Sequence, residues 1–245
     1  MNDPILFIPD VFCDSEIFAP QLVALGHEYD VVLSRALSAD RVVDMARRQA
    51  LHLPRRVSVV GYGLGAHVAL ELARIAPDQV SRVALISGDI FAQPPQVAAQ
   101  RETRIIDIRS GRFDFAVRHE LAYALGVEAD TSLDQNPLFG ALHAMAYRLC
   151  EQKVLEHVRL LQRRTDLQSL LRKLRMPCAV IAGRRDPILP TKRIQLTAEL
   201  APSSQLYLLD DVGHYPTWEA PDLVTDCLRD WLAIQPQSRI TPKDA

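Results

Sequence analysis

A glycine-rich turn, one aspartate and one histidine are the residues of this sequence whose types and spacing could do chemistry together. The turn Gly61–Gly65 lies between the apolar run Val57–Val60 and a helical pattern, and Asp186 and His214 each follow a later apolar run. In an open parallel sheet, residues just beyond the carboxyl ends of the strands meet at one edge. The spacing therefore predicts a site in which His214, oriented by a carboxylate, transfers protons.

The centre of this turn lacks a nucleophile. A strand, a tight glycine turn and a helix form a nucleophile elbow, which reads G-x-S-x-G in serine hydrolases, whereas Gly63 stands at the central position here. Serine and histidine act as a unit, so losing the hydroxyl removes roughly 10⁶-fold of the rate. Acyl-serine chemistry is therefore excluded. Glycine also leaves space in which a water could exchange a proton with His214.

Composition narrows the class of protein. The chain has 245 residues, of which 48% are hydrophobic, and this suits one α/β domain or one domain with an inserted cap. The net charge of −2 disfavours nucleic acid or an anionic membrane as the main partner. The four cysteines are scattered, which is typical of free thiols in a reducing compartment. We expect a cytoplasmic protein with no metal site and no cofactor.

Short apolar runs alternate with amphipathic stretches along the chain, and this alternation predicts a mostly parallel sheet covered by helices on both faces. Strands are expected over 5–8, 30–33, 57–60, 83–86, 178–181 and 206–209, and helices over 15–25, 40–52, 64–76 and about 219–233. Helical patterns without a convincing strand fill the interval between the fourth and fifth strands. The predicted organisation is an α/β core over 1–93 and 176–235, a helical cap over 94–175 and a loosely ordered tail over 236–245.

Several segments resemble the α/β-hydrolase-fold superfamily, in its small, capped esterase and acyl-hydrolase branch. The order of elbow, acid and histidine is that of the superfamily. Residues Ile8–Asp14 are similar to an L-P-G-L-L-C-D segment of one bacterial branch, Gly61–Leu72 to G-H-S-M-G-G-Y-V-A-L-E, and Arg109–Phe115 to a helical segment after the fourth strand. The resemblance extends from about residue 5 to 233. It implies the α/β-hydrolase fold with an inserted helical cap and without the usual leading hairpin.

The resemblance also implies roles for individual residues. His214 would be the general base and Asp186 the acid that orients it. The backbone N–H groups of Leu64 and Val11 would form the oxyanion hole, and the neighbouring Phe12 and Tyr62 would contact the substrate. Asp186 has a simpler alternative as the cap of a helix that begins near residue 190.

Asp10 is a second departure from the resemblance, because the branch has glycine beside the oxyanion loop. A carboxylate there would oppose a developing oxyanion, since such sites depend on hydrogen-bond donors. We predict that Asp10 faces the pocket and takes part in the chemistry. The alternative is a solvent-exposed loop carboxylate. Aromatic and methionine side chains of the cap are expected to form its core, with some facing an apolar cleft: Phe113, Phe115, Tyr123, Phe139, Met145 and Tyr147.

Three functions remain open from sequence. The first is an enzyme that uses the His214–Asp186 pair, with Asp10, as acid and base on a small, mostly apolar substrate, in lyase, cyclase, proton-transfer or water-addition chemistry. The second is a carboxyl-ester hydrolase whose serine has been replaced by Gly63. The third is a ligand-binding pseudo-hydrolase without catalysis. The sequence leaves the substrate and the oligomeric state open.

Overall fold

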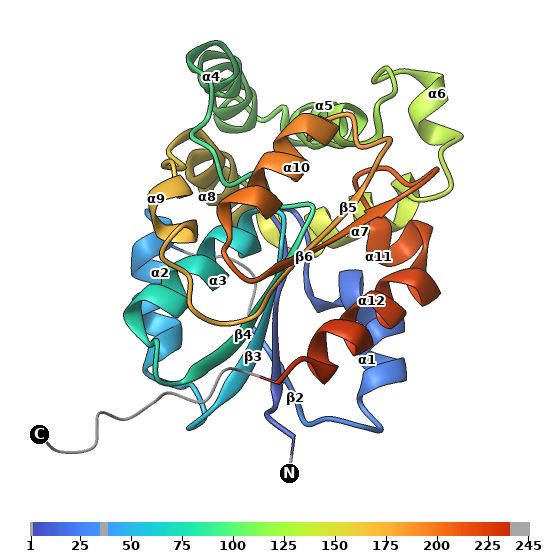
Figure 1. Cartoon of the computed structure of the whole chain (residues 1–245). Helices are drawn as coiled ribbons and strands as arrows, with labels where there is room; N and C mark the ends of the chain where they lie inside the picture. Colours follow the sequence, from blue (N-terminus) through green and yellow to red (C-terminus); the bar gives the residue numbers. More distant parts are fainter. Residues whose placement is uncertain (1, 35–38, 236–245) are drawn as a thin grey trace, which may run out of the picture.

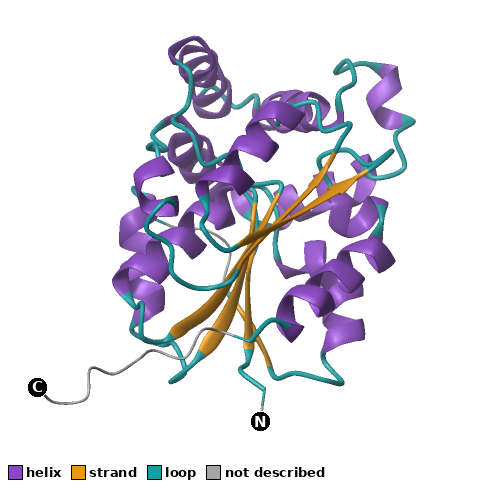
Figure 2. Ribbon diagram, viewed as in Figure 1, coloured by secondary structure: helices purple, strands orange, loops and turns teal. Residues whose placement is uncertain are grey.

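One parallel sheet of six strands organises the molecule, with helices on both faces (Figures 1 and 2). The computed structural model describes residues 2–34 and 39–235, so the predicted tail over 236–245 lies outside the described residues. The strands lie in the order β2-β1-β3-β4-β5-β6, and each neighbouring pair is parallel. Their bounds are Ile5–Ile8 for β1, Val31–Leu33 for β2, Val57–Tyr62 for β3, Val80–Ile86 for β4, Cys178–Gly183 for β5 and Ser204–Leu209 for β6.

The helices of the sheet layers follow from the amphipathic stretches between the strands. The short helices η1 (Ser15–Phe18) and α1 (Ala19–Leu25) lie on one face of the sheet with α11 (Pro216–Glu219) and α12 (Pro221–Ala233), and α2 (Val42–Ala50) and α3 (Leu64–Ile75) pair on the other (Figure 1). Helix α10 (Thr191–Leu200) packs on β5 and β6. The expected fold class, a mostly parallel sheet flanked by helices, is confirmed.

Within the described residues, the interval between β4 and β5 contains helices and no strand. Its helices are α4 (Pro95–Arg109), α5 (Phe113–Leu125), α6 (Thr131–Asp134), α7 (Phe139–Arg148), α8 (Cys150–Gln162) and α9 (Gln168–Leu171). Most of the interval lies beyond the carboxyl ends of the strands, whereas α9 packs against α3 and α10 (Figure 1). This position places most of these helices over the strand ends where Gly63, Asp186 and His214 lie.

The expected core of this helical interval is correct only in part. Phe139 and Met145 are buried, and Tyr123 lines the pocket described below, as expected of some of these side chains. Phe115 and Tyr147, however, each leave close to half of their surface exposed, at 47% and 45%. Helical spacing alone does not distinguish the face that packs inward from the face that leaves aromatic rings at the surface.

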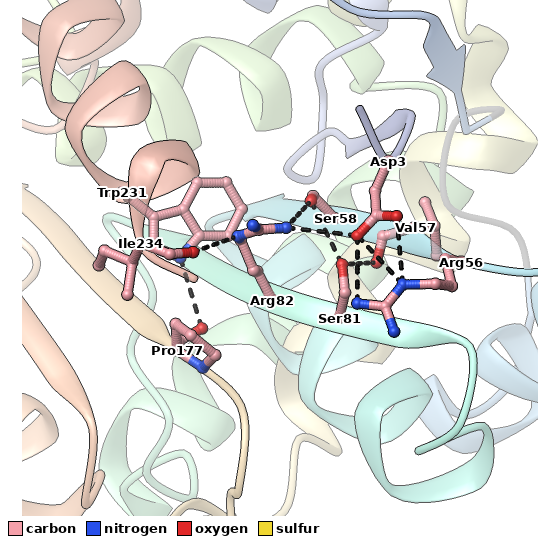
Figure 3. A network of polar contacts seen from close by, with 9 residues as sticks. All are labelled: Asp3, Arg56, Val57, Ser58, Ser81, Arg82, Pro177, Trp231 and Ile234. Atoms are coloured by element: carbon pink, nitrogen blue, oxygen red, sulfur yellow. Dashed lines mark hydrogen bonds and ion pairs between the residues drawn. The ribbon is translucent and has the colours of Figure 1, made fainter. Parts of the chain in front are cut away.

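A network of hydrogen bonds and ion pairs joins both ends of the described chain to the edge of the sheet where the strands begin (Figure 3). Arg82 on β4 donates from Nη1 to Asp3 Oδ2 at 3.3 Å and from Nε to the carbonyl of Ile234 at 3.0 Å. Asp3 also pairs with Arg56, and Trp231 donates to the carbonyl of Pro177. The network stands at the end of the sheet opposite the predicted site.

Sheet register determines which loops meet at the other end. Ile8 of β1 pairs with Gly61 of β3, so the positions two residues further along each strand, Asp10 and Gly63, reach the same level. None of the helices within residues 2–34 and 39–235 is long and apolar enough to cross a membrane.

Candidate active site

The elbow between β3 and α3 has the backbone that the glycine pattern predicts. Gly63 has φ 54° and ψ −117°, in the region that side-chain-bearing residues rarely adopt. A Cβ atom on Gly61 would lie closer than 3.0 Å to the carbonyl of Gly65, and one on Gly65 would lie equally close to the carbonyl of Ile8. Strand and helix therefore approach so closely that only glycine fits at both flanking positions.

The space of the missing nucleophile is filled by Asp10. A Cβ atom on Gly63 would overlap the carboxylate carbon and both carboxylate oxygens of Asp10, at separations well under 3.0 Å. The Asp10 side chain is buried, and its Oδ1 accepts a 2.6 Å hydrogen bond from the backbone N–H of Leu64. The expectation of a vacant space beside His214 is therefore wrong, because the carboxylate of the neighbouring loop occupies it.

His214 and Asp186 form a buried pair. Nδ1 of His214 donates to Asp186 Oδ2 at 2.8 Å, and the other oxygen of Asp186 accepts the backbone N–H groups of Ile188 and Leu189 at 2.8 and 3.0 Å. The aspartate thus binds the turn that follows it and orients the imidazole. It does not cap α10, whose N-cap Pro190 has no side-chain cap hydrogen bond, so the helix-cap alternative for Asp186 is wrong. With both oxygens bound, its carboxylate is fixed in one orientation.

The second ring nitrogen of His214 faces Asp10. His214 Nε2 lies 3.7 Å from Asp10 Oδ2, so the imidazole is flanked by two carboxylates. Burial lowers the pKa of His214, but the charges and hydrogen bonds of Asp186 and Asp10 outweigh burial and raise the pKa to about 10. The ring therefore carries a proton on each nitrogen at neutral pH.

The loop that carries His214 is fixed by groups outside the pocket. The hydroxyl of Tyr62 donates to the carbonyl of His214 at 2.6 Å, and the carboxylate of Glu219 accepts the backbone N–H groups of Gly213 and Tyr215 at 2.6 and 2.7 Å. Tyr62 is fully buried. Its side chain holds the loop of His214 and does not line the pocket, where it was expected to contact substrate.

The loop that carries Asp10 is fixed from the helical interval. The backbone N–H of Phe12, which has φ 61°, donates to Nδ1 of the buried His157 on α8 at 2.9 Å. Val11, Phe12 and Leu64 all line the pocket, as expected. However, the N–H of Leu64, one of the two expected oxyanion donors, is bound to Asp10.

A small pocket of about 50 Å³ opens onto these groups, far below the several hundred Å³ of sites for drug-sized ligands. It is lined by Asp10, Val11, Phe12, Gly63, Leu64, Ser87, Asp89, Arg101, Glu120, Tyr123, Ala124, Leu161, Arg164, Ile188, Leu189, His214 and Tyr215. Six of these residues are ionisable acids, arginines or histidine. The lining is thus more charged than the apolar cleft expected from sequence.

Sequence reasoning missed the charged wall of the pocket. Arg101 on α4 pairs with Glu120 on α5 at 2.6 Å, and Asp89 pairs with both Arg164 and Arg193. Arg101, Glu120 and Arg164 lie on or beside the helices between β4 and β5, where no strand end marks a residue as facing the site. Only Asp89, three residues after β4, follows a strand in the way that Asp186 does.

Other reactive groups near the pocket are held in inert forms. Burial lowers the pKa of His67 to about 4, and its neutral ring donates from Nε2 to the carbonyl of Asp89 at 2.6 Å. Burial raises the pKa of the Cys13 thiol far above its usual range, so this cysteine is a structural residue and no replacement nucleophile. Among the residues that the structure describes, no group of three His, Cys, Asp or Glu side chains could hold a metal ion.

Sequence comparison identifies esterases among the relatives. The chain is 32% identical over 177 residues to a pimeloyl-[acyl-carrier protein] methyl ester esterase of Methylococcus capsulatus, covering 67% of this chain and 65% of that relative. It is 30% identical to the esterase of the same description from Aromatoleum aromaticum, covering 72% and 76%. A putative carbamate hydrolase of Pseudomonas savastanoi is 24% identical, with 90% of both chains covered.

Solved structures share the fold. An esterase of Thermogutta terrifontis superposes with a TM-score of 0.81 at 21% identity, covering 95% of this chain and 90% of the other. The enol-lactonase of Burkholderia xenovorans gives a TM-score of 0.79 at 18% identity, covering 96% and 93%. The model of the alpha/beta hydrolase family matches residues 6–226, which include the elbow, the acid and the histidine. By sheet, elbow and sequence, the chain belongs to the alpha/beta hydrolase family.

Proposed function

We propose that this protein is an enzyme of the α/β-hydrolase fold that moves protons between Asp10, as base, and the protonated His214, as acid. The observation that carries the proposal is the position of the Asp10 carboxylate, which fills the nucleophile space above Gly63 and faces His214 Nε2 across 3.7 Å. A base and an acid at this spacing can act on two atoms of one small substrate.

The protonation of His214 determines its role. Since its pKa is raised to about 10, the imidazolium is the acid of the pair at neutral pH, where sequence reasoning had made it the base. Asp10 supplies the base, because its Oδ1 is engaged by Leu64 while Oδ2 is directed at His214. Asp186 holds the imidazolium and keeps Nε2–H pointed at the pocket.

The proposed step is balanced in protons. Asp10 Oδ2 takes a proton from a C–H or O–H group of the substrate, and His214 Nε2 gives its proton to a second atom of the same molecule. The net charge of the site does not change. Asp10 then gives its proton to water or product, and His214 takes one up, which restores both residues. Elimination, isomerisation by proton transfer and addition of water all fit this pattern.

The test uses transfer of solvent deuterium. A panel of small hydroxy acids, enol lactones and ketones is incubated with the protein in D₂O, and conversion and deuterium incorporation are followed by proton NMR. We expect the converted compound to lose turnover by about 10²–10⁴-fold in Asp10→Asn and in His214→Gln. The control Asp211→Asn removes an exposed carboxylate that pairs with Arg185 outside the pocket and leaves turnover unchanged. Unchanged turnover in both site variants would reject the proposal.

Ester hydrolysis is the second candidate, because the relatives described above include methyl ester esterases. Against it, the Leu64 N–H is occupied by a carboxylate, and an acyl oxyanion needs free donors at that position. Turnover of p-nitrophenyl acetate and butyrate that depends on His214 would support this candidate. We expect none above the rate of the His214→Gln variant.

A non-catalytic ligand binder is the third candidate, because the elbow carries Gly63 in place of a nucleophile. The retained His214–Asp186 pair argues for chemistry, because a binder has no need of a buried imidazolium held by two carboxylates. A compound from the panel that binds, is recovered unchanged and acquires no deuterium would support the binder. Conversion abolished by Asp10→Asn would exclude it.

A further inference from the structure

Two buried arginines stand in the wall of the pocket with donors left over. The side chains of Arg101 and Arg164 are only 8% and 9% exposed, and both line the pocket with Asp10 and His214. Each uses a terminal nitrogen in an ion pair, Arg101 with Glu120 and Arg164 with Asp89. The Nε atom of each is buried and has no hydrogen-bond partner within the described part of the chain.

Both arginines thus keep a buried N–H donor without an acceptor among the described residues, although both line the same small pocket. A buried N–H without an acceptor loses its bond to water and gains nothing in return. The hydroxyl of Ser87, which also lines the pocket and follows β4 with φ 45°, is likewise buried without a partner within residues 2–34 and 39–235. Three unsatisfied donors thus belong to residues that line one cavity, as expected for a site whose ligand carries acceptor atoms.

The charges of the wall indicate the sign of that ligand. The single carboxylate of Asp89 is shared by Arg164 and Arg193, so two guanidinium groups face one acid. Burial lowers the pKa of Arg164, and the charges of Arg101 and Arg193 add to this, although the charge of Asp89 opposes it. At this part of the wall the two guanidinium groups outnumber the one carboxylate that they share, and a bound anion would supply a second negative charge.

We propose that Arg101 and Arg164 form a carboxylate subsite, so that the substrate is a short-chain carboxylic acid. Its carboxylate accepts the two Nε–H groups, with Ser87 as a further donor, and its remaining carbon atoms extend toward Asp10 and His214. Planar guanidinium donors suit a carboxylate better than a neutral acceptor. The pocket volume of about 50 Å³ restricts the ligand to a few non-hydrogen atoms. The reaction of this acid rests on the proposed function, but its binding does not.

The experiment compares propionate with propionamide, which has the same shape and no charge. Both are titrated into the ¹⁵N-labelled protein, and the Nε–H signals of Arg101 and Arg164 are followed by NMR. We expect propionate to shift both signals and to bind about tenfold or more tightly than the amide. Arg101→Met and Arg164→Met weaken propionate binding by a similar factor. The control Arg47→Met removes an exposed arginine on α2 that pairs with Asp44, and it binds propionate as the wild type does.

Lysine variants control for the possibility that the methionine variants fail to fold. Arg101→Lys and Arg164→Lys keep the positive charge for Glu120 and Asp89 but remove the Nε–H donors, so they also bind propionate more weakly. The proposal is overturned if propionate and propionamide bind alike, if millimolar propionate leaves both Nε–H signals unmoved, or if the lysine variants bind propionate as tightly as the wild type. Propionate binding is measured without turnover, whereas the proposed proton transfer is measured by conversion and deuterium incorporation, so a failure of one and a failure of the other give different results.

Discussion

The backbone N–H of Phe12 donates a 2.9 Å hydrogen bond to Nδ1 of His157. The bond joins the loop after β1, which carries Asp10, to helix α8 of the interval between β4 and β5. Both residues are buried, and Phe12 has φ 61°, a conformation that costs about 1–3 kcal/mol for a residue with a side chain. The helical interval therefore helps to hold the loop in the conformation that directs Asp10 over Gly63.

Replacing His157 tests this relationship. We expect His157→Leu to leave the N–H of Phe12 without its acceptor, to destabilise the fold by about 1–3 kcal/mol and to loosen Asp10. The pKa of His214 then falls, because one of its two facing carboxylates is less firmly placed. The measurement is an NMR titration of the His214 ring. His157→Gln offers an oxygen acceptor in place of Nδ1 and restores part of the shift. A leucine variant with an unchanged His214 pKa would show that His157 does not position Asp10.

Gly63 and Asp10 are expected to be coupled. Gly63→Ser alone places a side chain on a strained backbone and against the Asp10 carboxylate, so it lowers the free energy of unfolding by at least about 1–3 kcal/mol. Asp10→Gly vacates that space, so the double variant recovers much of the loss. Urea unfolding of the four proteins forms a double-mutant cycle that measures the coupling.

The same four proteins test whether a serine at the elbow becomes a reactive nucleophile. Only the Asp10→Gly/Gly63→Ser variant has both a serine beside His214 and a free Leu64 N–H. We therefore expect a fluorophosphonate probe to label the double variant and neither single variant. Labelling of Gly63→Ser alone would mean that Asp10 swings away from the elbow without cost.

The raised pKa of His214 predicts alkaline destabilisation. The ring binds a proton more tightly in the folded state, with a pKa of about 10, than in the unfolded chain, where the ordinary value is 6.5. Its contribution is complete below pH 6.5 and is lost as the pH rises toward 10, at up to about 1.4 kcal/mol per pH unit. Urea unfolding between pH 6 and 10 measures the slope, and His214→Gln flattens it. A slope that survives in the variant would assign the loss to other groups.

The lowered pKa of His67 predicts that the folded protein loses stability in acid. Burial lowers its pKa to about 4, so the unfolded chain binds the proton more readily than the folded protein does. The contribution of neutral His67 is complete above pH 6.5 and is lost as the pH falls toward 4. We expect His67→Gln, which keeps a donor for the carbonyl of Asp89, to be less sensitive to acid over this range in thermal unfolding.

The residues at the ends of strands were predictable from sequence. Asp186 and His214 each follow a buried apolar run, and parallel strands deliver such residues to one edge. Asp10 was expected to face the pocket, and it does, because β1 and β3 are in register. Its contact with the elbow was not predictable, since a loop side chain's rotamer depends on neighbours such as His157 that lie far away in the sequence.

The charged wall of the pocket could not be predicted from sequence either. Arg101, Glu120 and Arg164 lie on or beside helices whose orientation over the sheet is determined by packing among themselves, and helical periodicity carries no mark for a pocket-facing arginine. Three expectations from sequence stay predictions: a mostly apolar substrate, the division into core and cap, and a cytoplasmic location.

The arginine at the other end of the sheet has a consequence for local unfolding. Since Arg82 binds both Asp3, ahead of β1, and Ile234, after α12, neither terminal segment can fray without disturbing the hydrogen bonds of the other (Figure 3). We expect Arg82→Met to increase amide hydrogen exchange in β1 and at the end of α12 together, and to leave β5 protected. The beginning and the end of the described chain would then open as one cooperative unit.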